Sequence, residues 1–257
     1  FALSAGASAL ETLPKDKSMS GMDIELVGRA DLWTYQSCDS YNESPLTQSY
    51  VDAGKLPPVN ERMPKEPWMA KKDQMVDGIG EYGGTFRHVI GGRPEGFNWL
   101  AGQSQGWGGI NIQLMESLTR LGPLWQVKAE EANPLPNLAK DWEFSADRKS
   151  LTMYLLEGAR WSDGDMFDTE DIDFWWNDNV QDANVNSRLP KDALGAGTTL
   201  EILGPYSFKF NFDEPKGNAV LAQLAYMGGA PGPPHVMKSL HPSNHSHATY
   251  ESYANGM

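Results

Sequence analysis

Acidic side chains gather in the stretch 158–176, where six carboxylates lie between Asp163 and Asp173. Carboxylates at such spacing can bind calcium, or act as an acid and base pair in glycoside hydrolysis. A calcium loop that starts at Asp163 needs an oxygen ligand at its fifth position and glycine at its sixth, but the sequence has Phe167 and Asp168 there. The calcium pattern therefore fails, whereas spacing alone leaves a paired-carboxylate site open.

Turn and helix-capping chemistry accounts for most of these acids. Asp163 can accept a hydrogen bond from the backbone that follows it, and Gly164 can adopt the positive φ of a tight turn. Asp168 is the predicted N-cap of a helix and Asp171 its N3 residue, so both carboxylates face the positive end of the helix dipole. We therefore favour a structural role for this stretch over catalysis.

A second chemical candidate is Ser104, because the segment 102–106 matches the G-x-S-x-G pattern of serine hydrolases. Four histidines follow it as possible bases: His235, His241, His245 and His247. The nucleophile elbow needs a buried strand before the serine, but residues 95–101 show neither alternation nor β-branched side chains. A serine hydrolase that uses Ser104 therefore stays the alternative function, and we predict that Ser104 is not a nucleophile.

The histidine-rich segment 241–247 raises the question of a metal site. His245 and His247 could share one ion if the chain between them is extended. Neither a cysteine nor a clear carboxylate stands nearby as a third ligand. We therefore predict a solvated loop, no bound metal and no cofactor.

Hydrophobic periodicity predicts the elements that position these groups. After Asp168, a helix would bury a stripe made of Ile172, Trp175 and Trp176. Strands are predicted at 150–156 and at 206–212, the second with aromatic residues at every other position. Further helices are predicted at 45–53, 111–121 and 219–227, each ended by glycine or by glycine and proline.

The candidate ligand-binding loop follows a predicted strand at 85–90. Its residues 91–99 combine flexible glycines with a cation, an acid and two aromatic rings. Ligands of open α/β sheets sit in loops at strand ends. We therefore predict a cleft wall here, made of Arg93, Pro94, Glu95, Gly96, Phe97, Asn98 and Trp107.

Four blocks of the sequence resemble one family. The run 155–174, with its Trp161-Ser-Asp-Gly164 core, resembles the signature of the peptide/nickel class of extracytoplasmic solute-binding proteins of ABC transporters, known as family 5. Segments 82–87, 136–145 and 205–215 are similar to other blocks of that family, in the same order. The chain departs from the signature at Leu156, Met166 and Asp168, where the family usually has Arg, Pro and Thr.

The resemblance implies a mixed α+β chain of the two-lobed periplasmic-binding-protein type II fold. It divides the chain into an irregular N-terminal extension (1–78), the start of lobe I (79–110), an inserted α+β subdomain (111–227) and a return to lobe I (228–257). A further lobe is expected after Met257, so only part of the cleft lies in this chain.

The implied function is capture of a small peptide or similar organic solute, and its delivery to an inner-membrane ABC permease. Hinge closure over the solute would let the permease recognise the loaded state. The resemblance implies a periplasmic location and no enzymatic activity. A purely structural exported protein is a weaker alternative.

Composition is consistent with that reading. The chain has 257 residues, a formal net charge of -13 and a pI near 4.8, which argues against binding to nucleic acid or to an anionic membrane. Cys38 is the only cysteine, so an internal disulfide is excluded, and no apolar run approaches the length of about 20 residues that a membrane helix needs. Small residues at 1–9 could be the tail of a secretory signal.

Overall fold

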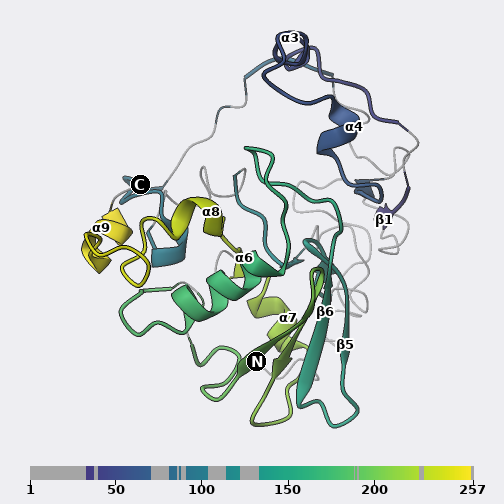
Figure 1. Cartoon of the computed structure of the whole chain (residues 1–257). Coiled ribbons are helices and arrows are strands. Elements are labelled where there is room, and N and C mark those ends of the chain that lie inside the picture. Colours follow the sequence, from purple (N-terminus) through teal and green to yellow (C-terminus); the bar gives the residue numbers. More distant parts are fainter. Residues whose placement is uncertain are drawn as a thin grey trace.

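The computed structural model describes residues 33–37, 40–70, 81–85, 87, 91–103, 114–121, 133–187, 189, 191–225 and 229–255. It is a mixed α/β structure in which a four-stranded sheet packs against one helical segment (Figure 1). The sheet strands are β5 (Ala139–Phe144), β6 (Ser150–Leu155), β7 (Thr199–Gly204) and β8 (Ser207–Asn211).

The sheet is antiparallel throughout, in the order β5-β6-β8-β7. Strand β6 lies in its centre, with Leu151 opposite Phe210 and Met153 opposite Phe208. These four side chains are fully buried, because alternate residues of each strand point to the same face. The predicted strands 150–156 and 206–212, including the aromatic alternation of the second, are confirmed.

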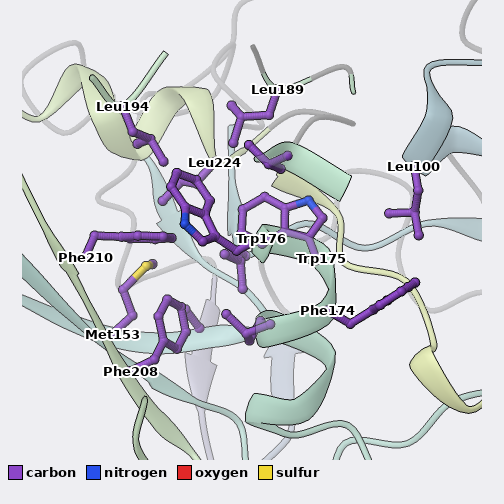
Figure 2. Packing of buried hydrophobic residues seen from close by; sticks show 14 of the residues in the cluster. Leu100, Met153, Phe174, Trp175, Trp176, Leu189, Leu194, Phe208, Phe210 and Leu224 are labelled. Atoms are coloured by element: carbon purple, nitrogen blue, oxygen red, sulfur yellow. The ribbon is translucent and has the colours of Figure 1, made fainter. Parts of the chain in front are cut away.

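A helical segment covers the buried face of the sheet. It begins as α6 (Thr169–Asp173) and continues as a π-helix, η4 (Phe174–Val180). Ile172, Trp175 and Trp176 are buried, as the periodicity predicts, and the ring centroids of Trp176 and Phe210 lie 4.9 Å apart. Figure 2 shows this contact, with Met153 and Phe208 on the sheet side of the tryptophans.

The predicted helix at 111–121 is wrong for residues 115–121, whereas Leu114, its first described residue, is helical. Thr119–Arg120 form strand β3, which pairs with β4 (Leu135–Pro136). The backbone N–H of Leu118 donates to the carbonyl of Gly229 at 3.0 Å, and the hydroxyl of Thr119 donates to the carbonyl of Leu221 at 2.6 Å. Partners about 100 residues away therefore override the local helical pattern.

Short helices account for most of the remaining elements. Helix α7 (Ala219–Gln223) ends earlier than the prediction of 219–227, of which residues 226 and 227 lie outside the described part. After it come α8 (Pro234–Met237) and α9 (Tyr250–Asn255), which lie together on one side of α6 in Figure 1. The strand predicted at 85–90 falls mostly on residues that are not described, and Thr85 itself is not in a strand.

The described part of the N-terminal extension is more regular than expected. Helix α3 (Gln48–Asp52) ends just before Gly54, which confirms the helix predicted at 45–53. Helix α4 (Val59–Arg62) and an antiparallel pair formed by β1 (Trp33–Tyr35) and β2 (Trp68–Ala70) were not predicted. In the ranges that the structure covers, no helix has the length and apolar character needed to cross a membrane.

Candidate ligand-binding site

The predicted cleft loop is fixed at its C-terminal end. Asn98 N-caps a short 3-10 helix, η2 (Trp99–Ala101), by accepting a hydrogen bond from the N–H of Ala101 at 3.4 Å. Gly102 then ends the helix with a left-handed φ of 77°, close to the carbonyl of Asn186. The indole of Trp99 donates to the carbonyl of Ala230 at 3.3 Å. The loop therefore rests on the segment that follows α7.

The predicted site residues differ sharply in exposure. Arg93, Pro94 and Glu95 are exposed, and Phe97 keeps 47% of its surface exposed. Asn98 is fully buried, and its amide group bonds to two backbone partners. Residues 93–97 thus form an outward-facing rim above a buried base at Asn98. Trp107, the last residue of the predicted wall, lies outside the described residues, as does Ser104.

Two surface cavities lie elsewhere in the described structure. One, of about 530 Å³, lies where β5, β6 and β8 meet. It is lined by Lys140, Asp141, Tyr154, Leu155, Glu157, Pro205, Tyr206 and Ser207. The other, of about 280 Å³, lies between the start of α6 and α8, and its lining includes Asp165, Asp168, Glu170 and Asp171 together with His235 and Lys238. Neither cavity includes a residue of the predicted cleft loop.

His235 joins α8 to the acidic turn. Its Nε2 lies 2.7 Å from a carboxylate oxygen of Asp163, and its Nδ1 lies 2.9 Å from one of Asp165. The hydrogen bond from His235 lowers the pKa of Asp163. The Asp163–Gly164 turn is confirmed, with the N–H of Asp165 donating to Asp163 and Gly164 at a φ of 99°. These carboxylates therefore link two segments that lie 72 residues apart.

The acids at the start of α6 form the predicted capping box. Asp168 accepts from the N–H of Glu170 at 2.7 Å, and Asp171 accepts from the N–H of Asp168 at 2.7 Å. The indole of Trp161 also donates to Asp171, at 2.8 Å. Burial raises the pKa of Asp171 to about 6, although the hydrogen bonds from the N–H of Asp168 and from the indole of Trp161 lower it. The carboxylates considered as a catalytic pair thus stabilise the turn at Asp163 and the start of helix α6.

The histidine segment is not wholly solvated, and the prediction is wrong for His241. This side chain is fully buried, and its ring packs edge-on against Tyr253, with centroids 4.7 Å apart, and also against Phe174. Burial lowers the pKa of His241. His245 and His247 are exposed, with ring centroids 5.9 Å apart. Across the described ranges, no three His, Cys, Asp or Glu side chains are arranged to hold a metal.

The local structure before Ser104 differs from a nucleophile elbow. An elbow places its serine directly after a buried strand. Here residues 93–98 are loop, residues 99–101 form the 3-10 helix, and Gly102 follows in the left-handed region. The strand expected by the hydrolase alternative is therefore missing from residues 91–103.

Sequence reasoning missed the buried groups that hold the loop. Tyr253 is 2% exposed, and its backbone carbonyl accepts from the amide of Asn98 at 2.6 Å. Its hydroxyl donates to Asn179 at 2.5 Å. The one sequence signal was the period of α9, which places Tyr250, Tyr253 and Ala254 at i, i+3 and i+4. Their partners lie too far away in sequence for that signal to identify.

Comparison with known proteins gives a consistent result. Residues 133–254 match the family model described as bacterial extracellular solute-binding proteins, family 5, middle region. The chain is 46% identical, over its whole length, to the periplasmic alpha-galactoside-binding protein of Rhizobium meliloti, and it covers 37% of that protein. It therefore spans little more than a third of the length of this relative.

Solved structures share the fold. A periplasmic binding protein of Agrobacterium fabrum, solved in complex with stachyose, has a TM-score of 0.85 and 44% identity, covering 96% of this chain and 36% of its own. The oligopeptide-binding protein OppA has a TM-score of 0.62 and 30% identity, covering 82% of this chain and 30% of its own. Sequence match, family model and backbone similarity thus agree with the motif at Trp161–Gly164, and the chain belongs to family 5 of the bacterial extracellular solute-binding proteins.

Proposed function

We propose that this protein is the solute-binding component of an ABC importer, acting in the periplasm, and that its solute is an oligosaccharide of the α-galactoside class. The observation that carries the proposal is the 46% identity, across the whole chain, to an alpha-galactoside-binding protein. The structure of the relative with stachyose, an α-galactoside, supports the same ligand class. We propose a sugar and not the peptide that the motifs imply, because the oligopeptide-binding protein OppA is less similar to this chain, in sequence and in backbone, than the protein solved with stachyose.

The exposed rim suits such a ligand. A sugar ring has an apolar face and a polar edge of hydroxyl groups, so its site combines aromatic surface with a few oriented polar groups. Phe97 supplies exposed aromatic surface, and Arg93 and Glu95 supply a charged donor and charged acceptors on the same loop. We propose that residues 93–97, together with Trp107, form one wall of the cleft and that a second lobe forms the other.

Closure of two lobes over the sugar would couple binding to delivery. A ligand that touches both lobes favours the closed state by its differential affinity, and the permease can then distinguish loaded from empty protein. Residues 1–257 alone would cover one face of the sugar. We therefore expect this segment to bind much more weakly than the complete two-lobed protein.

Calorimetry tests the proposal. The complete protein is titrated with stachyose, with a β-galactoside as control and with a mixed pool of short peptides. Stachyose should bind, and Phe97→Ala should weaken binding about tenfold, as expected for an aromatic anchor. Tyr154→Ala is the matched control, since Tyr154 is a similarly exposed ring in the cavity at β6.

Three outcomes would contradict the proposal. Binding of the peptide pool but not of stachyose would return the ligand class to peptides. A larger effect of Tyr154→Ala than of Phe97→Ala would move the site to the sheet cavity. Equal affinity of residues 1–257 and of the complete protein would rule out capture between two lobes.

A further inference from the structure

A buried polar network lies directly beneath the exposed rim. Its three hydrogen-bonded members, Asn98, Asn179 and Tyr253, are each 0–2% exposed. They come from three separate parts of the chain: the end of the cleft loop, the π-helix η4 and α9, and the buried ring of His241 packs against Tyr253. Buried polar groups are costly unless they are paired, so a network that spans distant segments fixes their relative positions.

Tyr253 is the centre of this network. Its carbonyl accepts from Asn98 Nδ2 at 2.6 Å, its hydroxyl donates to Asn179 Oδ1 at 2.5 Å, and its ring packs against His241. Burial raises the pKa of Tyr253, so the hydroxyl stays a neutral donor near pH 7. Asn179 in turn donates to the carbonyl of Phe174 at 3.1 Å, within the π-helix. One residue of α9 thus connects the cleft loop to the helix that packs on the sheet.

Asn98 joins the rim to this network through a single side chain. Its oxygen caps η2, and its nitrogen bonds to Tyr253. The amide oxygen and the amide nitrogen of Asn98 each form a hydrogen bond with a backbone group, and no surface of the residue is exposed. The side chain therefore does not face a ligand. Phe97, the next residue toward the rim, is 47% exposed. The boundary between rim and base therefore falls between these two residues.

We propose that Asn98 and Tyr253 form a positioning anchor that holds the rim 93–97 in its binding geometry, and that Asn98 acts through this anchor and does not contact the solute. This inference rests on the proposed function of the rim. A rim held in place before binding loses less conformational freedom when the solute arrives, so the anchor contributes to affinity without touching the ligand. Loosening it should weaken binding and increase motion in the same loop.

The test compares two variants that each lose one buried side-chain hydrogen bond to a carbonyl. Asn98→Ser keeps an oxygen able to cap η2, but the shorter side chain cannot reach Tyr253. Thr119→Val is the matched control, because Thr119 donates to the carbonyl of Leu221 at 2.6 Å and is also fully buried. Both variants are made in the complete protein and compared well below their unfolding temperatures.

Two readouts separate positioning from mere stability. Hydrogen exchange of the amides in 91–97 is measured without ligand, and the Kd for stachyose is measured by calorimetry. Both variants should lose similar stability, but only Asn98→Ser should speed exchange in the loop and raise Kd, each about tenfold, the equivalent of one buried hydrogen bond. Tyr253→Phe, which leaves the carbonyl for Asn98 but releases Asn179, should speed the same exchange by a smaller factor.

The outcomes are distinct. If Asn98→Ser raises Kd while loop exchange is unchanged, Asn98 contacts the solute directly and the anchor is rejected. If Asn98→Ser and Thr119→Val have equal effects on both readouts, the bond to Tyr253 is only structural and the anchor is also rejected. If the unaltered protein does not bind stachyose, the proposed function fails, and the exchange comparison still decides the anchor. If Asn98→Ser does not fold, Tyr253→Phe replaces it. Faster exchange in residues 91–97 of Tyr253→Phe supports the anchor, and unchanged exchange rejects it.

Discussion

Asp171 gives the sharpest test of the electrostatics of the capping box. This residue is 2% exposed, and burial raises the pKa of its carboxyl group from 3.8 to about 6. A carboxyl with a raised pKa binds its proton more tightly in the folded state, so its contribution to stability is greatest below pH 3.8 and is lost as the pH rises through 6. The whole shift corresponds to about 3 kcal/mol, of which about 2 kcal/mol falls between pH 4 and pH 7.

The substitution Asp171→Asn isolates this effect. Asparagine keeps one oxygen for the two donors, the N–H of Asp168 and the indole of Trp161, so one donor loses its partner at a cost of about 1–3 kcal/mol at any pH. Asparagine does not ionise. We therefore expect the stability deficit of the variant, relative to the unaltered protein, to shrink by about 2 kcal/mol between pH 4 and pH 7.

Urea unfolding at a series of pH values measures this difference. Asp173→Asn is the matched control: it makes the same change in charge on the same helix, but Asp173 is only half-buried and bonds to the side chain of Asn177. The control shows what the loss of one negative charge on this helix does to stability. If the deficit of Asp171→Asn does not shrink as the pH rises, the carboxylate of Asp171 is not desolvated in the folded protein, and the reasoning is refuted.

Three further predictions concern the core and the loop base. Gly102→Ala should lower the free energy of unfolding in urea by about 1–3 kcal/mol, because φ is 77° and a Cβ would lie 2.2 Å from the carbonyl oxygen of Asn186. Gly217 has open space around it, so Gly217→Ala should lower the same free energy by less than about 1 kcal/mol. Equal losses in the two variants would contradict the close contact between Gly102 and Asn186. Trp176→Ala should cost about 3–5 kcal/mol in the same assay, and a cost below about 1 kcal/mol would mean that the tryptophan is not part of the core. Because burial lowers the pKa of His241, the unfolded state binds a proton first, so stability should fall as the pH drops below about 6.5. Replacement of His241 by leucine should flatten that part of the pH profile, and an unchanged profile would contradict the assignment.

Local patterns predicted the elements whose partners lie close in sequence. Asp168 and Asp171 are three residues apart, so capping chemistry alone identified the helix start. The alternation of aromatic and polar residues at Phe208 and Phe210 predicted the buried face of β8. The fold class and the family followed from blocks of this kind, and each was confirmed.

Distant partners explain what local patterns missed. Thr119 has the spacing of a helix, but its strand conformation depends on Leu221 and on the segment near Gly229. From the sequence alone, Asn98 is a polar loop residue, but in the structure its side chain donates a hydrogen bond to Tyr253, 155 residues later. His241 is predicted to be solvated, but in the structure its ring packs against Phe174 and Tyr253. In each case the burial is a property of the assembled fold.

The distance in sequence between Asn98 and Tyr253 also bears on the order of folding. Sheet strands β6 and β8 and the helix between them can assemble from residues 150–211, whereas the cleft loop waits for a contact that closes a much longer stretch of chain. Long closures are entropically costly and form late. We expect the sheet to gain protection from exchange before the loop during refolding, so that a chain emerging from synthesis has its core before it has a binding surface. Such a delay would keep the rim from capturing solute until α9 is in place.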